Sequence, residues 1–228
     1  MLSEMIQDCR LRKEYGCNSL RPPIDSVLDR LRDFESIAGN DYTDAFVRLT
    51  MKKGSYLLSE GEISHHVWFL EKGVARLFVW QDSKDITSDF FFSSEFIGSY
   101  DTSTLKIRSG INIQLLTNAT LYSISWTKLE VLKKHYPELI EIEKNIVACY
   151  LKCIKTRVIE FQMLSPTERY LKLIREYPYI IHQVSCYMIA SYLGISKETF
   201  SRIRARVKKR KWGYGLVYKV CMTFKVKP

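Results

Sequence analysis

The chain has 228 residues, of which 46% are hydrophobic and 26% charged, so it can form one large domain or two modest ones. No stretch approaches the roughly 18 apolar residues of a membrane span, and the charged start MLSEMIQDCRLRKEYG differs from a signal peptide. We therefore expect a cytoplasmic protein with no membrane partner. The net charge of +10 comes from residues 165–228, where Lys and Arg number 14 and Asp and Glu number 3, which favours a polyanionic partner.

The cysteines are scattered along the chain, at Cys9, Cys17, Cys149, Cys153, Cys186 and Cys221. They do not show the paired C-x-x-C spacing of a zinc site or the density of a disulfide-rich domain. Reduced thiols and no metal site are therefore expected.

Residues 1–39 are expected to form an N-terminal helical extension, and from there to about Ser125 the chain is predicted to form short strands. Aromatic and β-branched residues are concentrated in the runs GSYLLSEGE, HHVWFLEKGVARLFVW, KDITSDFFFSSEFIGS and NIQLLTNATLYSIS, which are bounded by Gly, Ser, Asp and Asn. Evenly spaced strands of this kind usually close into a sandwich or jelly roll. A β-roll domain over residues 40–135 is predicted.

A long helix is predicted over residues 136–164. Pro137 can occupy the first position of a helix, and neither Pro nor Gly then occurs before Pro166. The helix would carry two apolar stripes, one through Leu139, Ile142, Ile146, Cys149 and Cys153, the other through Val147, Leu151, Ile154, Val158 and Phe161. One stripe can cover the β domain while the other meets a partner, which predicts a homodimer; the alternative is that both stripes are buried within one chain.

A new helix is predicted to begin at LSPTERYLKLI. Ser165 can cap it, Pro166 suits its first position, and Glu168 can reach back to the cap, which makes a capping box. We place the hinge between the domains here, with residues 165–228 as the C-terminal domain.

The stretch ASYLGISKETFSRIRARVKKR predicts a helix-turn-helix. Gly194 can take the positive φ that ends the first helix, after Ile189, Ala190 and Leu193, and Ser196 is a natural N-cap for the second helix. At 100° per residue, Phe200, Ile203 and Val207 form one buried stripe. The opposite face carries Lys197, Glu198, Ser201, Arg202 and Ala205 and is free to enter a DNA major groove.

The exposed face has the chemistry to read bases, whereas the alternative is a charged face that is merely solvated. Arg can donate two hydrogen bonds to guanine and Glu can accept from cytosine, so Lys197, Glu198, Ser201 and Arg202 are the candidate base-reading residues. Contacts to DNA phosphates, which add affinity without sequence choice, are expected from Ser196, Thr199, Arg206, Lys208 and Lys209.

Over roughly residues 40–210 the sequence resembles the Crp/Fnr (cyclic-AMP receptor protein) family of bacterial transcription regulators. The resemblance rests on VSCYMIASYLGISKETFSRIRARV, on LSPTERYLKL, and on KKGSYLLSEGE, WFLEKGVARLF and EFIGSY. In this family the pattern S-[KR]-E-T-x-[SG]-R marks the recognition helix, and its base-reading positions fall on Lys197, Glu198 and Arg202.

The resemblance implies an α+β fold with an N-terminal cyclic-nucleotide-binding-type β jelly roll that acts as a sensor, a long dimerisation helix and a C-terminal winged helix-turn-helix. It also implies a homodimer on double-stranded DNA with an inverted-repeat operator, and RNA polymerase as a partner. The wing would fall within residues 212–228, where KWGYGLVYKVCMTFKV can form a hairpin with Gly213 and Gly215 in its turn.

The candidate effector pocket departs from the pattern of family members that bind cyclic AMP. Those members hold the ribose with a Gly-Glu pair and the cyclic phosphate with an Arg-Ser pair, whereas this chain has Gly98-Ser99, and Arg108-Ser109 aligns only after deletion of one residue. The bulky Tyr100 is also expected to fill space that the nucleotide would otherwise occupy. Cyclic AMP is therefore disfavoured, no cofactor is assigned, and the effector, if there is one, stays unidentified.

Two other sensing chemistries are disfavoured by the sequence, and one of two other functions stays open. Cys9 and Cys17 are too few and too widely spaced for an iron–sulfur sensor, and His65 and His66 lie at a strand start that we expect to be exposed, which disfavours a haem site. An enzyme on a β sandwich is not expected, because the chain has no HExxH, Gly-x-Ser-x-Gly or P-loop motif. A DNA-binding regulator whose β-roll binds a protein instead of a small molecule stays open.

Overall fold

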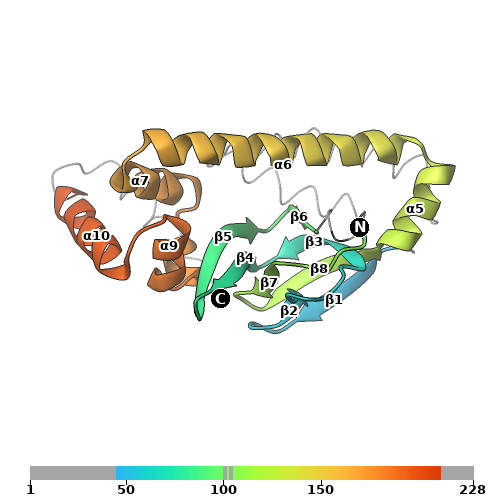
Figure 1. Ribbon diagram of the computed structural model, residues 1–228, viewed down its shortest axis with the longest axis horizontal. Coiled ribbons are helices and arrows are strands. Elements are labelled where there is room, and N and C mark those ends of the chain that lie inside the picture. The colour runs from blue at the N-terminus through green and yellow to red at the C-terminus, as the bar shows by residue number, and fades with distance from the viewer. Residues whose placement is uncertain (1–44, 100–101, 103–104, 212–228) are drawn as a thin grey trace, which may run out of the picture. The chain divides into compact units, whose positions relative to one another are not determined.

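The computed structural model describes residues 45–99, 102 and 105–211, except for the side chains of residues 209–211 (Figure 1). The chain divides into two compact units between Gln162 and Met163. The predicted N-terminal extension at residues 1–39, the predicted wing at 212–228 and Tyr100 lie outside the described residues.

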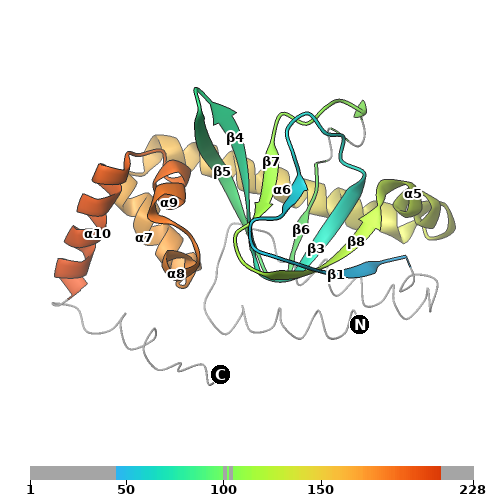
Figure 2. The ribbon, with the colours of Figure 1, turned by 90° about the horizontal axis from the view of Figure 1, so that it is seen from below.

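The first unit is a β-roll of two antiparallel four-stranded sheets (Figure 2). One sheet has the strand order β1-β8-β3-β6 and the other β2-β7-β4-β5. The strands are β1 (Val47–Met51), β2 (Tyr56–Leu58), β3 (His66–Lys72), β4 (Val74–Gln81), β5 (Lys84–Phe92), β6 (Glu95–Ile97), β7 (Asn112–Leu115) and β8 (Ala119–Ser125).

The longer runs that the sequence marks as strands each contain two strands with a tight turn between them. The β3–β4 turn requires Gly73, because its φ is +133° and a Cβ there would lie 2.8 Å from the Cβ of Ala119. Ser94, with φ of +68°, lies in the turn between β5 and β6. The first strand, β1, lies outside the predicted runs. It forms because it pairs antiparallel with β8, with Val47 opposite Ser123 and Met51 opposite Ala119.

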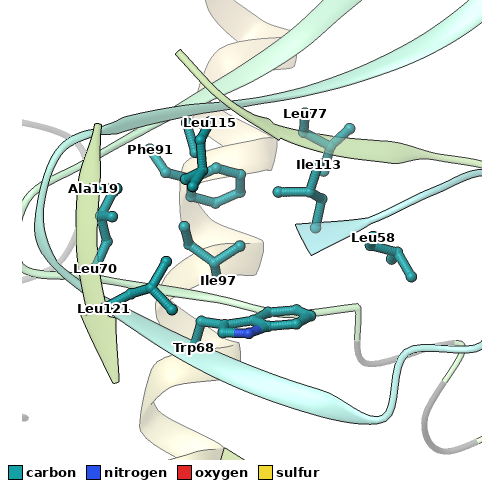
Figure 3. Packing of buried hydrophobic residues seen from close by; sticks show 11 residues of the cluster. Leu58, Trp68, Leu70, Leu77, Phe91, Ile97, Ile113, Leu115, Ala119 and Leu121 are labelled. Carbon is teal, nitrogen blue, oxygen red and sulfur yellow. The ribbon is translucent and has the colours of Figure 1, made fainter. Parts of the chain in front are cut away.

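Side chains from the inner faces of both sheets form the core of the roll (Figure 3). In Figure 3 one sheet contributes Leu58, Leu77, Phe91, Ile113 and Leu115, and the other contributes Trp68, Leu70, Ile97, Ala119 and Leu121. Full burial of an aliphatic or aromatic side chain contributes about 1.5–3 kcal/mol, so this cluster is a main source of stability for the unit.

Two helices follow the last strand. Helix α5 (Trp126–His135) is capped by the Ser125 hydroxyl, which accepts from the Lys128 N–H at 3.2 Å. The buried ammonium of Lys133 joins α5 to helix α6 (Glu138–Met163), because it pairs with Glu130 at 2.7 Å and with Glu143 at 2.5 Å. Burial lowers the pKa of Lys133, but the two carboxylates outweigh it and the pKa is raised.

Helix α6 matches the predicted long helix and shows the two predicted stripes. Leu139 and Ile142 of the first stripe are buried, whereas Leu151 and Val158 of the second are 59% and 54% exposed. Among the described residues, Cys149, Cys153 and Cys186 are reduced thiols, and burial raises the pKa of Cys149.

The second unit is helical. It contains α7 (Pro166–Glu176), α8 (Ile180–Gln183), α9 (Cys186–Tyr192) and α10 (Lys197–Lys211), of which the short α8 was not predicted (Figure 2). The capping box is confirmed, because the Ser165 hydroxyl accepts from the Glu168 N–H and the Glu168 carboxylate accepts from the Ser165 N–H. These bonds lower the pKa of Glu168.

Candidate functional site

Helices α9 and α10 are joined by a tight turn whose polar groups are satisfied locally. Gly194 has the predicted positive φ, at +67°, and the Ile195 N–H donates to the Ala190 carbonyl at 3.0 Å. The predicted N-cap is also confirmed, because the Ser196 hydroxyl accepts from the Thr199 N–H at 3.2 Å. The direction in which α10 leaves the turn is therefore set by backbone hydrogen bonds and a cap.

One face of α10 is buried in the helical unit. Phe200 is 1% exposed, and its ring meets that of Tyr170 edge to face at a centroid distance of 5.3 Å. Ile203 is buried one turn further along, and an Arg204 N–H donates to the Cys186 thiol at 3.2 Å, which ties α10 to α9. These contacts fix the rotation of α10 about its own axis.

The opposite face of α10 carries the candidate base-reading residues. Lys197, Glu198, Ser201 and Arg202 are all exposed, and the Arg202 Nε donates only a long bond of 3.4 Å to the Glu198 carbonyl. Hydrogen bonding with its own backbone N–H, and then with the Ser196 side chain, lowers the pKa of the Glu198 carboxylate. The charged carboxylate is therefore favoured near neutral pH, as an acceptor for a donor outside the chain.

The candidate phosphate contacts lie in two environments. Arg206 and Lys208 are exposed further along α10, whereas the hydroxyls of Ser196 and Thr199 bond to each other at 3.1 Å within the helix cap. The side chain of Lys209 lies outside the described part of the chain.

The Arg-Ser pair of the candidate effector pocket is bound to the backbone of the chain. The Arg108 guanidinium is exposed and donates to the Gly61 carbonyl at 2.8 Å. Ser109 is 3% exposed, and its hydroxyl donates to the Ile111 carbonyl at 2.8 Å and accepts from the Ile111 N–H at 3.1 Å. Both side chains therefore hold the loop together.

Residues 98, 99 and 102, which precede this pair in the chain, make close contacts. Ser99 is buried, and its carbonyl accepts from the hydroxyl of Thr102 at 3.1 Å. A Cβ at Gly98 would come within 2.8 Å of a Val67 methyl group, so a larger residue there would require the Val67 side chain to shift. His65 and His66 are exposed at the start of β3, as predicted.

Two polar side chains near these sites carry no sequence signal. Asn112 is buried, and its carbonyl oxygen accepts from the Glu60 N–H at 3.0 Å, while its Nδ2 has no partner among the described residues. Arg169 of α7 contacts two backbone carbonyls in the helical unit. Neither role could be predicted, because Asn112 reaches a residue 52 positions away and Arg169 reaches one 24 positions away.

Within the described ranges, His, Cys, Asp and Glu side chains do not gather in threes or more as they would to hold a metal ion. Among the helices of the same ranges, none has the length and apolar character to cross a bilayer.

Comparison with known proteins identifies the fold. No protein-family model matches the chain, and no curated protein matches it by sequence. The c-di-GMP-responsive global regulator CLP from Xanthomonas campestris matches 77% of this chain and 92% of its own, with a TM-score of 0.61 and 14% identity.

Two further solved structures give the same result. A cyclic nucleotide-binding domain containing protein from Listeria monocytogenes matches 80% of this chain and 92% of its own, with a TM-score of 0.60 and 13% identity. A putative transcriptional regulator of the Crp/Fnr family from Eubacterium rectale matches 79% and 86%, with a TM-score of 0.61 and 15% identity. The chain therefore has the mixed α and β fold of Crp/Fnr-type regulators, with a cyclic-nucleotide-binding-type β-roll.

Proposed function

We propose that the chain is a dimeric, sequence-specific DNA-binding transcriptional regulator of the Crp/Fnr type. The observation that carries the proposal is the orientation of α10, which buries Phe200 and Ile203 and exposes Glu198 and Arg202. A helix held in this way can lie in the major groove with its first turns against the base edges. In this role α9 and α10 form a helix-turn-helix.

The exposed residues of α10 divide into two roles by their chemistry. The Arg202 guanidinium has the two donors that grip guanine O6 and N7, and the Glu198 carboxylate can accept from cytosine N4. Lys197 and Ser201 complete the base-reading set. Arg206, Lys208 and Lys209 supply positive charge for DNA phosphates. The hydroxyls of Ser196 and Thr199 can donate hydrogen bonds to phosphate oxygens.

The exposed stripe of α6 supports a dimer. An apolar row through Leu151, Ile154, Val158 and Phe161 is costly to leave in water, and a twofold axis along the helix would cover it with its own copy. The sensor would then be residues 40–135, the dimerisation helix 136–164 and the DNA-binding domain 165–228. The operator would be an inverted repeat with half-sites about 10 base pairs apart.

Two alternatives differ in what the β-roll does. A regulator that needs no small-molecule effector, and whose roll binds a protein, fits the same fold. The solved structures named above are described as regulators or nucleotide-binding proteins, which favours a regulator over an enzyme on a β sandwich. Contact with RNA polymerase stays a prediction from the resemblance.

The proposal is tested by first selecting an operator from random DNA. The DNA affinities of one arginine variant and one lysine variant are then compared with those of the wild type. Arg202→Ala should cost about 1–3 kcal/mol on the operator and little on random DNA, because it removes base contacts. Lys208→Ala should weaken binding to all sequences and reduce the slope of log K against log salt by about one unit. An equal loss on operator and random DNA for Arg202→Ala would contradict base reading.

The dimer is tested by sedimentation of the wild type and of Leu151→Asp, which places a charge in the exposed stripe of α6. The wild type should sediment as a dimer at micromolar concentration and the variant as a monomer. A wild-type monomer both with and without DNA would overturn the dimer.

A further inference from the structure

The Arg169 guanidinium donates hydrogen bonds to two backbone carbonyls that lie 29 residues apart, at positions 164 and 193. It is half-buried in the first turns of α7, where its Nη1 donates to the Leu164 carbonyl at 2.7 Å and its Nη2 donates to the Leu193 carbonyl at 3.0 Å. Both bonds lie within the second compact unit. A single guanidinium therefore joins two points of the backbone.

Both carbonyls lie at helix ends. Leu164 directly follows the last residue of α6, and Leu193 is the C-cap of α9, immediately before Gly194 and the turn into α10. Carbonyls at helix ends lack intrahelical donors and need other partners. A planar guanidinium suits this geometry, because its separate nitrogens can donate in two directions at once, whereas a lysine ammonium is a single point of donation.

We propose that Arg169 is a positioning residue that couples the end of α6 to the turn that orients α10. The proposal rests on the proposed function, since α10 is the helix that would read DNA. A displacement of the backbone at Leu164 would be transmitted through one rigid side chain to Leu193, and from there to the start of α10. Arg169 itself is not proposed to touch DNA.

The first test is hydrogen exchange on the full chain without DNA. Arg169→Met keeps most of the aliphatic stem and removes both bonds, and Arg175→Met, which changes an exposed arginine of the same helix, is the control. Peptides that cover residues 163–168 and 192–197 should both exchange about 10-fold faster in Arg169→Met, because each loses a bond that resists local opening. The control should exchange like the wild type. Arg169→Lys should protect at most one of the two segments.

The second test measures function on the same variants. Arg169→Met should bind the operator about 10-fold more weakly while its affinity for random DNA stays unchanged, because the basic charges of α10 remain but their orientation loosens. Thermal unfolding of each variant shows whether the unit stays folded at the assay temperature. A purely structural arginine would lower both affinities together.

The outcomes distinguish a failure of the coupling through Arg169 from a failure of the proposed DNA-binding function. Unchanged exchange in either segment would overturn the coupling, and so would faster exchange in both with full operator affinity. If the wild type bound no DNA, the proposed function would fail, and the exchange of the two segments would still support or overturn the coupling.

Discussion

Helix α10 and the loop at residues 106–111 both carry residue patterns typical of a ligand site, yet they use their polar side chains differently. On α10, Glu198 and Arg202 are exposed, and the hydrogen bonds that they make within the chain stay in the first turns of the helix. In the loop, Arg108 and Ser109 hydrogen-bond to the backbone of the chain itself. The same kinds of residue are available to a partner in one region and committed in the other.

The difference follows from how each backbone satisfies its own polar groups. Beyond its first turn, a helix pairs its N–H and C=O groups internally, so the side chains that follow the cap of α10 are not needed for that purpose. An irregular loop leaves N–H and C=O groups unpaired, and Ser109 pairs with both groups of Ile111. A motif therefore indicates function only where the surrounding backbone does not need its side chains.

The largest effect is expected from the buried side of α10. Phe200→Ala should lower the free energy of unfolding by about 3–5 kcal/mol, because it leaves a cavity against Tyr170. Urea denaturation of the full chain measures this change. Lys197→Ala, on the exposed side, is the control and should have almost no effect, so equal losses for the two variants would break the distinction between the faces.

A smaller effect is expected in the loop. Ser109→Ala should cost about 1–3 kcal/mol of stability, because it leaves the half-buried N–H and C=O groups of Ile111 without their partner. The matched variant is Ser201→Ala, which removes an exposed hydroxyl from α10 and should be nearly neutral in the same denaturation experiment. A neutral Ser109→Ala would mean that its hydroxyl is available to a ligand after all.

A still smaller effect is expected from the charge on Glu198. Its pKa is lowered in the folded chain, first by its own backbone N–H and then by Ser196, so the charged form stabilises the fold above the unfolded pKa of about 4.3. The thermal midpoint of the wild type should exceed that of Glu198→Gln near neutral pH. The gap should close as the pH falls through the folded pKa of Glu198. A gap that widens in acid would have the wrong sign.

No effect is expected from cyclic nucleotides. Titration calorimetry with cyclic AMP and cyclic GMP should show no micromolar binding, because Arg108 is bound to Gly61 and Ser99 replaces the carboxylate that holds the ribose. Arg108→Ala is the control for any heat observed. Micromolar binding that this variant abolishes, together with tighter operator binding by the liganded chain, would show that the loop is a nucleotide site.

Most of the regular structure could be predicted from the sequence. The long helix, the capping box at Ser165 and the turn at Gly194 were predicted, because each depends on residues within one or two turns of one another. Strand β1 was missed, since only its pairing with β8 makes a strand of Val47–Met51. The split of each long strand run was also missed. At the Gly73 turn, for example, the close approach to Ala119 joins residues that are far apart in the chain.

The sequence by itself determined which residues of α10 share a face, because the 3.6-residue period of a helix relates neighbours along the chain. It also determined the two stripes of α6. Only the tertiary structure decided that Arg108 is bound to Gly61 and that Arg169 joins Leu164 to Leu193. These bonds join residues with no fixed spacing, so they exist only where packing has already brought a donor within about 3 Å of a free carbonyl.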